Sequence, residues 1–92
     1  MVLNLKLYVT GSTPGLQRQV AALRGILDEA LGGAYELQVL DIFTHPDAAY
    51  DDAVVATPTL VRRLPPPAAQ IIGDLSDRER VLVGLHVEEP GA

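Results

Sequence analysis

The residues best placed for chemistry form the run Gly11-Ser12-Thr13-Pro14, which pairs two hydroxyls with a turn and a helix start. At such a junction between a strand and a helix, redox proteins place a Cys-x-x-Cys pair, because the helix N-terminus lowers the pKa of a thiol. The chain has no cysteine, and neither hydroxyl is acidic enough to act as a thiolate does. Thiol exchange, disulfides and zinc–thiolate sites are therefore excluded.

The same junction raises the alternative of a small glutathione-binding or thiol-ligand-binding protein centred on Ser12 and Pro58. Asp74 and Ser76 would complete that ligand set. Enzymes of this kind add a helical second domain, however, and we expect this chain to hold one domain spanning 1–92. We favour helix capping for Ser12 and Ser76, since serine is a preferred N-cap residue.

Metal or acid–base chemistry has weak support in this sequence. His45 and His86 lie far apart, and neither has a neighbouring ligand at helical spacing. Asp47, Asp51 and Asp52 have the spacing of a solvated helix face. We therefore expect no catalytic residue, no metal and no cofactor.

The charge of the chain limits its partners. Twelve acidic and seven basic side chains give a formal net charge of −5, which argues against nucleic acid. No apolar run approaches the roughly 20 residues of a membrane span, and the N-terminus has no signal-peptide pattern. We expect a cytoplasmic protein without membrane contact. Arg18, Arg62 and Arg63 form either a patch for an anionic partner or ordinary solubilising charge.

The first half of the chain predicts a strand, a helix and a second strand. Residues 3–9 alternate as a strand does, and Thr13 with Pro14 marks a helix start. An apolar stripe at helical spacing follows and ends at Gly32-Gly33. Residues 35–42 carry apolar side chains on both faces, which predicts a central strand.

The second half predicts a short helix over 47–54, a strand from Ala56 and an antiparallel strand over 68–72. A last helix would begin at Ser76, in a capping box with Glu79, and end near 88–90 before a frayed tail. The order β-α-β-α-β-β-α is the minimal thioredoxin-like α/β topology, a mixed sheet with helices on both faces. In that fold a cis proline precedes the third strand, which predicts a cis bond at Pro58.

Nearly the whole chain resembles the KaiB family of circadian-clock proteins in order and spacing. The segments that carry the resemblance are Leu5-Lys6-Leu7-Tyr8-Val9, Thr13-Pro14, Ala56-Thr57-Pro58-Thr59-Leu60, Leu64-Pro65-Pro66-Pro67 and Ile71-Ile72-Gly73-Asp74-Leu75-Ser76-Asp77-Arg78-Glu79. The resemblance implies a non-enzymatic protein-binding module that docks on a KaiC-type ring ATPase. It also implies a sensor histidine kinase as competitor.

The resemblance further implies two packings of the second half: the thioredoxin-like one and a fold-switched one that forms tetramers. Six of the seven prolines lie in residues 46–92, and the run from Val81 to Leu85 suits either strand or helix. We expect the thioredoxin-like packing to dominate, with a monomer or a homo-tetramer depending on the fold state. The residues assigned to the switch are Pro65, Pro66, Pro67, Gly73, Asp74, Ser76, Gly84 and His86.

The partner-binding surface implied by the resemblance lies near Arg18, at the edge around Gln38, and at Arg62. The family commonly carries basic residues at the positions of Gln38, Ala69 and Gln70. The departures at these positions point to a divergent paralogue.

Overall fold

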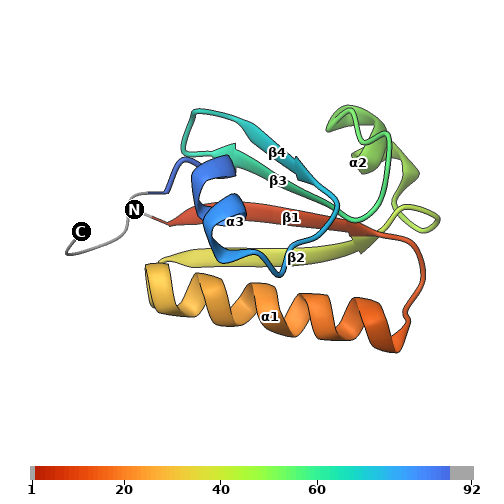
Figure 1. The fold of residues 1–92 in the computed structure, drawn as a ribbon. Helices are drawn as coiled ribbons and strands as arrows, with labels where there is room; N and C mark the ends of the chain where they lie inside the picture. The colour runs from red at the N-terminus through yellow and green to blue at the C-terminus, as the bar shows by residue number, and fades with distance from the viewer. Residues whose placement is uncertain (1, 88–92) are drawn as a thin grey trace.

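The computed structural model describes residues 2–87, and its strands and helices follow the order predicted from the sequence (Figure 1). The elements are β1 (Leu3–Val9), α1 (Pro14–Leu31), β2 (Tyr35–Asp41), α2 (Pro46–Asp51), β3 (Thr59–Leu64), β4 (Ala69–Ile72) and α3 (Arg78–Gly84). The boundaries of β1 and the start of α1 agree with the sequence. The helix predicted over 47–54 begins one residue earlier and ends at Asp51.

The four strands form one mixed sheet in the order β2-β1-β3-β4. β1 pairs in parallel with β2, whereas β3 is antiparallel to both β1 and β4. The prediction that residues 35–42 form a central strand is wrong, because β2 lies at the edge of the sheet. Its apolar side chains occupy both faces since each face is covered: Leu37 packs against the larger core, and Leu40 is buried in the smaller one.

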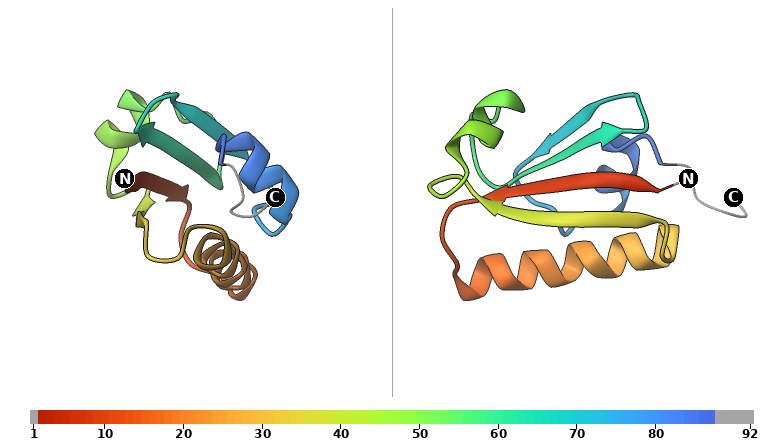
Figure 2. Two further views of the ribbon diagram at one scale, coloured as in Figure 1. Left: turned by 90° about the vertical axis from the view of Figure 1, so that its left-hand side faces the viewer. Right: turned by 180° about the vertical axis from the view of Figure 1, so that it is seen from behind.

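Helices cover the two faces of the sheet unequally (Figure 2). α1 and α3 lie on one face, and α2 lies at one end of the other. The main core fills the first face with side chains from β1, α1, β3, β4 and α3. Its buried members are Leu3, Leu5, Leu7, Val9, Leu23, Ile26, Leu27, Ala30, Leu60, Ile71, Leu75, Val81, Leu82 and Leu85. The second face has a small core of Tyr8, Leu40, Ala49 and Val61 under α2.

α1 begins and ends where the sequence predicts. The Thr13 hydroxyl accepts a hydrogen bond from the Leu16 N–H at 3.1 Å, and Pro14 occupies the first helical position. Gly32 follows the last turn with φ of +59°, a conformation that glycine adopts without a steric penalty. The helix spans 18 residues and so forms a long rigid support beneath β1 and β2.

The capping box predicted for the last helix is wrong. Asp77 is the N-cap residue of α3, and its carboxylate accepts a hydrogen bond from the Arg80 N–H at 3.1 Å. The Ser76 hydroxyl instead donates to the Asp74 carboxylate at 2.6 Å. α3 also ends at Gly84, earlier than predicted, and His86 adopts a φ of +58° that helical residues do not have. The frayed tail that the sequence predicts lies outside the described residues.

This difference in capping can be measured. We expect Asp77→Ala to lower the free energy of unfolding by about 1 kcal/mol, because it removes the side-chain acceptor at the start of α3. Ser76→Ala should have a smaller effect, since the Ser76 hydroxyl is exposed and donates to the loop residue Asp74, not to the backbone of α3. Urea denaturation of both variants gives the comparison, and a larger loss for Ser76→Ala would contradict the assignment.

Candidate functional site

The junction of β1 and α1, where redox relatives of this fold hold their thiols, is lined by hydroxyls. The Thr10 and Thr57 hydroxyls lie 2.8 Å apart, and the Thr57–Pro58 peptide bond is cis. The Ser12 hydroxyl accepts a hydrogen bond from the Gln17 side-chain amide at 3.2 Å. These hydroxyls therefore bond to one another and to neighbouring amides, and within residues 2–87 none of them is hydrogen-bonded to a histidine or carboxylate that could activate it. The prediction that Ser12 caps the helix is wrong, because Thr13 is the N-cap residue of α1.

The four residues of the alternative glutathione site do not share a cavity. Pro58 lines a hollow of about 330 Å³ together with Thr10, Thr13 and Thr57. Ser12 lines a second hollow, between α1 and β2, which adjoins the first at Val9 and Leu16 but does not include Pro58. Asp74 and Ser76 bond to each other in the loop before α3. The geometry thus offers no assembled site for a tripeptide thiol.

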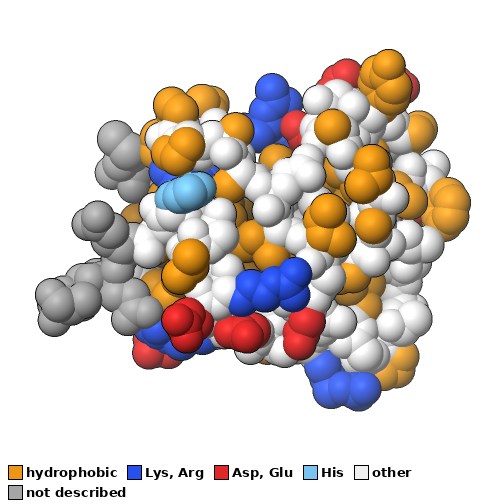
Figure 3. Space-filling model, turned by 45° about the horizontal axis from the view of Figure 1, so that its top comes forward, with side chains coloured by type: hydrophobic (Ala, Val, Ile, Leu, Met, Phe, Trp, Pro, Cys, Tyr) orange, Lys and Arg blue, Asp and Glu red, His pale blue; other side chains and the backbone are white. Residues whose placement is uncertain are grey.

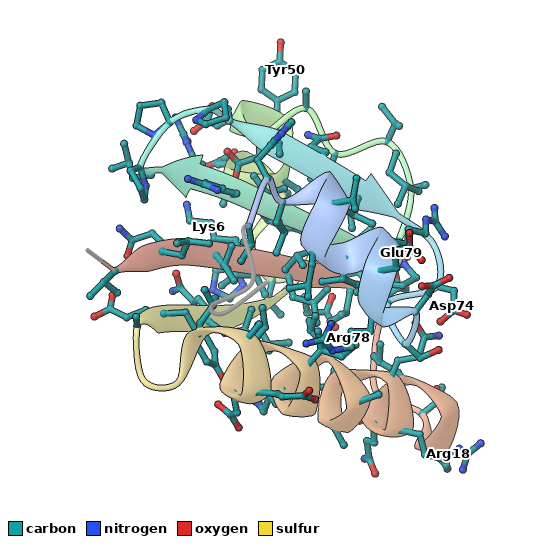
Figure 4. The ribbon with its side chains drawn as sticks, turned by 60° about the vertical axis from the view of Figure 1, so that its left-hand side comes forward. Lys6, Arg18, Tyr50, Asp74, Arg78 and Glu79 are labelled. Carbon is teal, nitrogen blue, oxygen red and sulfur yellow. The ribbon has the colours of Figure 1, made fainter. Side chains whose placement is uncertain are left out.

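Of the residues assigned to partner binding, two are exposed. Arg18 lies near the start of α1, and Figure 4 shows its side chain projecting from the molecule. Gln38 lies on the edge strand β2, opposite Lys6 of β1. Both side chains are therefore accessible to another protein.

The third, Arg62, is not on the surface, and the expectation that its guanidinium is exposed is wrong. Only 7% of the residue is accessible. Its Nε donates to the Pro65 carbonyl at 2.9 Å, and its Nη1 donates to the carbonyls of Leu85 and His86. Arg62 thus joins β3 to the proline turn and to the C-terminal end of α3, where unpaired carbonyls favour a cation.

Asp52, which the sequence suggests is solvated, is a buried carboxylate. Its side chain is 3% exposed, and the Tyr8 hydroxyl donates to its Oδ2. Arg63 Nη1 lies 2.9 Å from Oδ1 and Lys6 Nζ lies 3.9 Å from Oδ2. The Gln70 amide also donates to the Asp52 carbonyl. Asp52 therefore connects the end of α2 to β1, β3 and β4.

Burial of the phenol, and then its hydrogen bond to Asp52, raise the pKa of Tyr8 well above its usual value. The unfolded chain has the usual pKa of about 10, so the unfolded state loses this proton first as the pH rises. The protonated Tyr8 hydroxyl therefore makes its full contribution to the free energy of unfolding below about pH 10, and this contribution decreases as the pH rises further. We expect Tyr8→Phe to flatten the fall in stability between about pH 10 and 11. Tyr50→Phe is the matched control, because Tyr50 is 85% exposed; an equal effect in both would contradict this account.

The histidines lie in separate places. His45 Nδ1 is 2.9 Å from the Thr44 hydroxyl, and His86 follows the end of α3. Between residues 2 and 87 the structure brings together no cluster of three or more His, Asp or Glu side chains of the kind that holds a metal. None of the helices described for these residues is long and apolar enough to cross a membrane.

Sequence reasoning missed an apolar surface around α2. Phe43, Tyr50 and Val55 are 74%, 85% and 84% exposed, and hydrophobic side chains gather on this side of the molecule in Figure 3. Exposed aromatic side chains of this kind are frequent in protein–protein interfaces. The signal in the sequence is that these bulky side chains lie within and beside a short helix whose other apolar residues are only Pro46, Ala48 and Ala49.

Comparisons with known proteins match this chain to the model of the KaiB domain over residues 6–87. The Circadian clock oscillator protein KaiB of Prochlorococcus marinus (strain MIT 9303) is 54% identical over 81 residues, which cover 88% of this chain and 68% of that protein. The protein of the same name from Nostoc sp. (strain PCC 7120) is 53% identical, with 88% of this chain and 75% of that protein covered.

Solved structures show the same fold. The N-terminal domain of Synechococcus elongatus SasA superposes with a TM-score of 0.77 at 26% identity, covering all of this chain and 90% of that one. Mitochondrial thioredoxin 3 of Saccharomyces cerevisiae has a TM-score of 0.70 at 16% identity, covering 91% of this chain and 76% of that one. The thioredoxin-like topology predicted from the sequence is confirmed.

Proposed function

This chain belongs to the KaiB family, and we propose that it is a non-enzymatic regulatory module of a circadian clock or a related signalling system. It acts by docking on a KaiC-type ring ATPase in the cytoplasm, where a sensor histidine kinase with a similar domain competes for the same partner. The observation that carries the proposal is the 54% identity to a named clock oscillator protein across 88% of the chain. The absence of cysteine agrees with a role in binding and not in redox chemistry.

The docking surface includes Arg18 on α1 and Gln38 on β2, which are both exposed. Arg62 supports this surface from inside the fold and does not contact the partner, because its guanidinium is occupied by the carbonyls of Pro65, Leu85 and His86. Side chains at the solvent-exposed rim of an interface contribute modestly to the binding free energy. The loss of either Arg18 or Gln38 should therefore weaken docking without abolishing it.

Co-elution of the chain with a purified KaiC-type hexamer tests the proposal. We expect Arg18→Ala and Gln38→Ala each to weaken binding by about threefold to tenfold. Arg80→Ala is the matched control, since Arg80 is exposed on α3 and its guanidinium contacts the Ile72 carbonyl. Failure of the wild-type chain to bind any such ATPase would count against the whole proposal.

The second part of the proposal is a fold switch of residues 65–86 between the thioredoxin-like packing and a tetrameric one. α3 has only 7 residues, and its β-branched Val81 and Val83 favour a strand over a helix. NMR secondary shifts across 81–87 report the packing, and sedimentation reports the assembly. We expect helical shifts with a monomer as the major species. Shifts typical of a β-strand in a monomer would contradict the proposed link between the alternative packing and the tetramer.

A titration with glutathione distinguishes the proposed function from the rival function, which is binding of a thiol ligand. Because Ser12 and Pro58 line two different hollows and Ser76 lines neither of them, we expect glutathione to cause no saturable amide shifts at Ser12, Thr59 or Ser76. Saturable shifts at these three positions, removed by Ser12→Ala, would support the thiol-ligand reading instead.

A further inference from the structure

Bulky apolar side chains are exposed on and beside α2, the short helix that covers one end of the second sheet face. Phe43 lies in the turn before α2, Tyr50 on the helix itself and Val55 in the loop after it, and each is largely exposed. Figure 4 shows the Tyr50 side chain projecting away from the sheet. Apolar side chains that gather on one surface in this way mark a site where another molecule binds.

The polar side chains that accompany Tyr50 on α2 are acidic. Asp47 lies three residues before Tyr50 and four residues before Asp51, and residues at these spacings are neighbours on a helix surface. Both aspartates are exposed, and neither forms an ion pair within residues 2–87. α2 therefore presents an aromatic ring beside two carboxylates that are open to a partner.

The negative charge around α2 is only partly neutralised by the rest of the chain. Residues 25–61 contain seven acidic side chains and no Lys or Arg, and four of those acids lie within residues 41–52. Lys6 and Arg63 lie against one of the four, Asp52, and offset two of the charges. A net charge of −2 remains, which attracts a cationic partner and disfavours an anionic one.

An apolar hollow of about 190 Å³ lies at the same helix. It is lined by Ile42, Ala49, Val54, Val55, Ala56 and Thr57, and this lining contains no charged side chain. A hollow of this size and character suits one aliphatic side chain of another protein. We call Phe43, Asp47, Tyr50, Asp51 and this hollow together the α2 surface.

Arginine is the cation that fits a ring beside carboxylates, because its planar guanidinium stacks on aromatic faces and pairs with carboxylate oxygens. We propose that the α2 surface binds a segment of a partner protein in which an arginine adjoins a leucine or another aliphatic residue. The guanidinium lies against Tyr50 and Asp47, and the aliphatic side chain enters the hollow. The inference goes beyond docking on a ring ATPase, because the α2 surface includes neither Arg18 nor Gln38.

A titration of the ¹⁵N-labelled full chain at low ionic strength tests the proposal. The probe is the acetylated and amidated pentapeptide Ser-Arg-Leu-Leu-Ser, and two control peptides replace the arginine with glutamine or both leucines with serine. We expect the probe to cause saturable amide shifts at Phe43, Tyr50 and Val55, with a dissociation constant of about 1 mM. Each control peptide should bind at least about threefold more weakly, because it lacks one of the two contacts.

Substitutions on α2 identify the groups that bind the probe. Tyr50→Ser should weaken its binding by about fivefold, whereas Tyr50→Phe should retain it, because the aromatic ring supplies the contact. Asp47→Asn should weaken binding by about threefold. Glu79→Gln is the matched control and should have no effect, since Glu79 is an exposed acid in the first turn of α3, as Asp47 is in the first turn of α2.

The peptide titration and the ATPase experiment can fail separately. Arg18→Ala should leave binding of the peptide unchanged while it weakens docking on the ATPase, and Tyr50→Ser should have the opposite pair of effects. Equal binding of the three peptides, equal losses for Asp47→Asn and Glu79→Gln, or no saturable shift around α2 would each overturn the inference.

Discussion

Replacement of Arg62 with alanine is expected to lower the free energy of unfolding by about 3 kcal/mol, the largest loss among the changes considered. Three carbonyls accept from its guanidinium, and those of Leu85 and His86 lie at the end of α3. Hydrogen bonds from charged donors each contribute about 1.5 to 3 kcal/mol, although part of this is offset by the cost of burying the cation. Without the guanidinium, the C-terminal end of α3 loses its hydrogen bonds to β3 and is held there only by core packing.

Arg62→Met separates hydrogen bonding from packing, because methionine fills much of the same volume without a donor. We expect both variants to speed hydrogen exchange at the amides of Val81, Leu82 and Leu85 more than at those of β1. Arg18→Ala, on the exposed side of α1, should leave both the free energy of unfolding and the hydrogen exchange of the α3 amides unchanged. A stable Arg62→Ala protein with unchanged exchange in α3 would contradict the role assigned here.

The second large effect is expected for Asp52→Ala, at about 2 kcal/mol. The substitution removes the acceptor of the fully buried Tyr8 hydroxyl and the carboxylate on which Arg63 and Lys6 rest. An unpaired buried hydroxyl costs about 1 to 3 kcal/mol, and the partly exposed ion pairs add up to about 1 kcal/mol. The nearby Ala48 carbonyl, 3.1 Å from the Tyr8 hydroxyl, limits the loss by offering another acceptor.

Asp51→Ala is the matched control for this prediction. The two aspartates are adjacent, but Asp51 is exposed and Asp52 is buried. Surface substitutions usually change stability by less than about 0.5 kcal/mol. Urea denaturation at pH 7 gives both values, and similar losses for the two variants would mean that the carboxylate of Asp52 has no special role.

The first half of the fold could be predicted because its signals are local. The alternation of residues 3–9 and the Thr13 and Gly32 caps each specify their structure without help from distant residues. The position of β2 at the sheet edge could not be predicted in the same way. Strand order depends on β3 pairing with the opposite side of β1, and that pairing joins residues far apart in the sequence.

The candidate site was harder to predict for a similar reason. Arg62 and Arg63 are neighbours of the same type, and only the register of β3 against β1 places one inside and the other on the open face. Likewise, Asp51 and Asp52 differ because α2 ends at this point and its last turn packs on the sheet. For the last helix, Ser76 and Asp77 are both preferred N-cap residues, so composition alone does not choose between them.

The central claim is that this thioredoxin-like chain works by binding a protein and not by thiol chemistry. Size-exclusion chromatography of the chain with a KaiC-type ring ATPase, run beside the Arg18→Ala and Arg80→Ala variants, addresses it most directly. We predict co-elution of the wild-type chain and of Arg80→Ala, with a reduced bound fraction for Arg18→Ala. A chain that never co-elutes but turns over a thiol substrate, with turnover lost in Ser12→Ala, would contradict the claim.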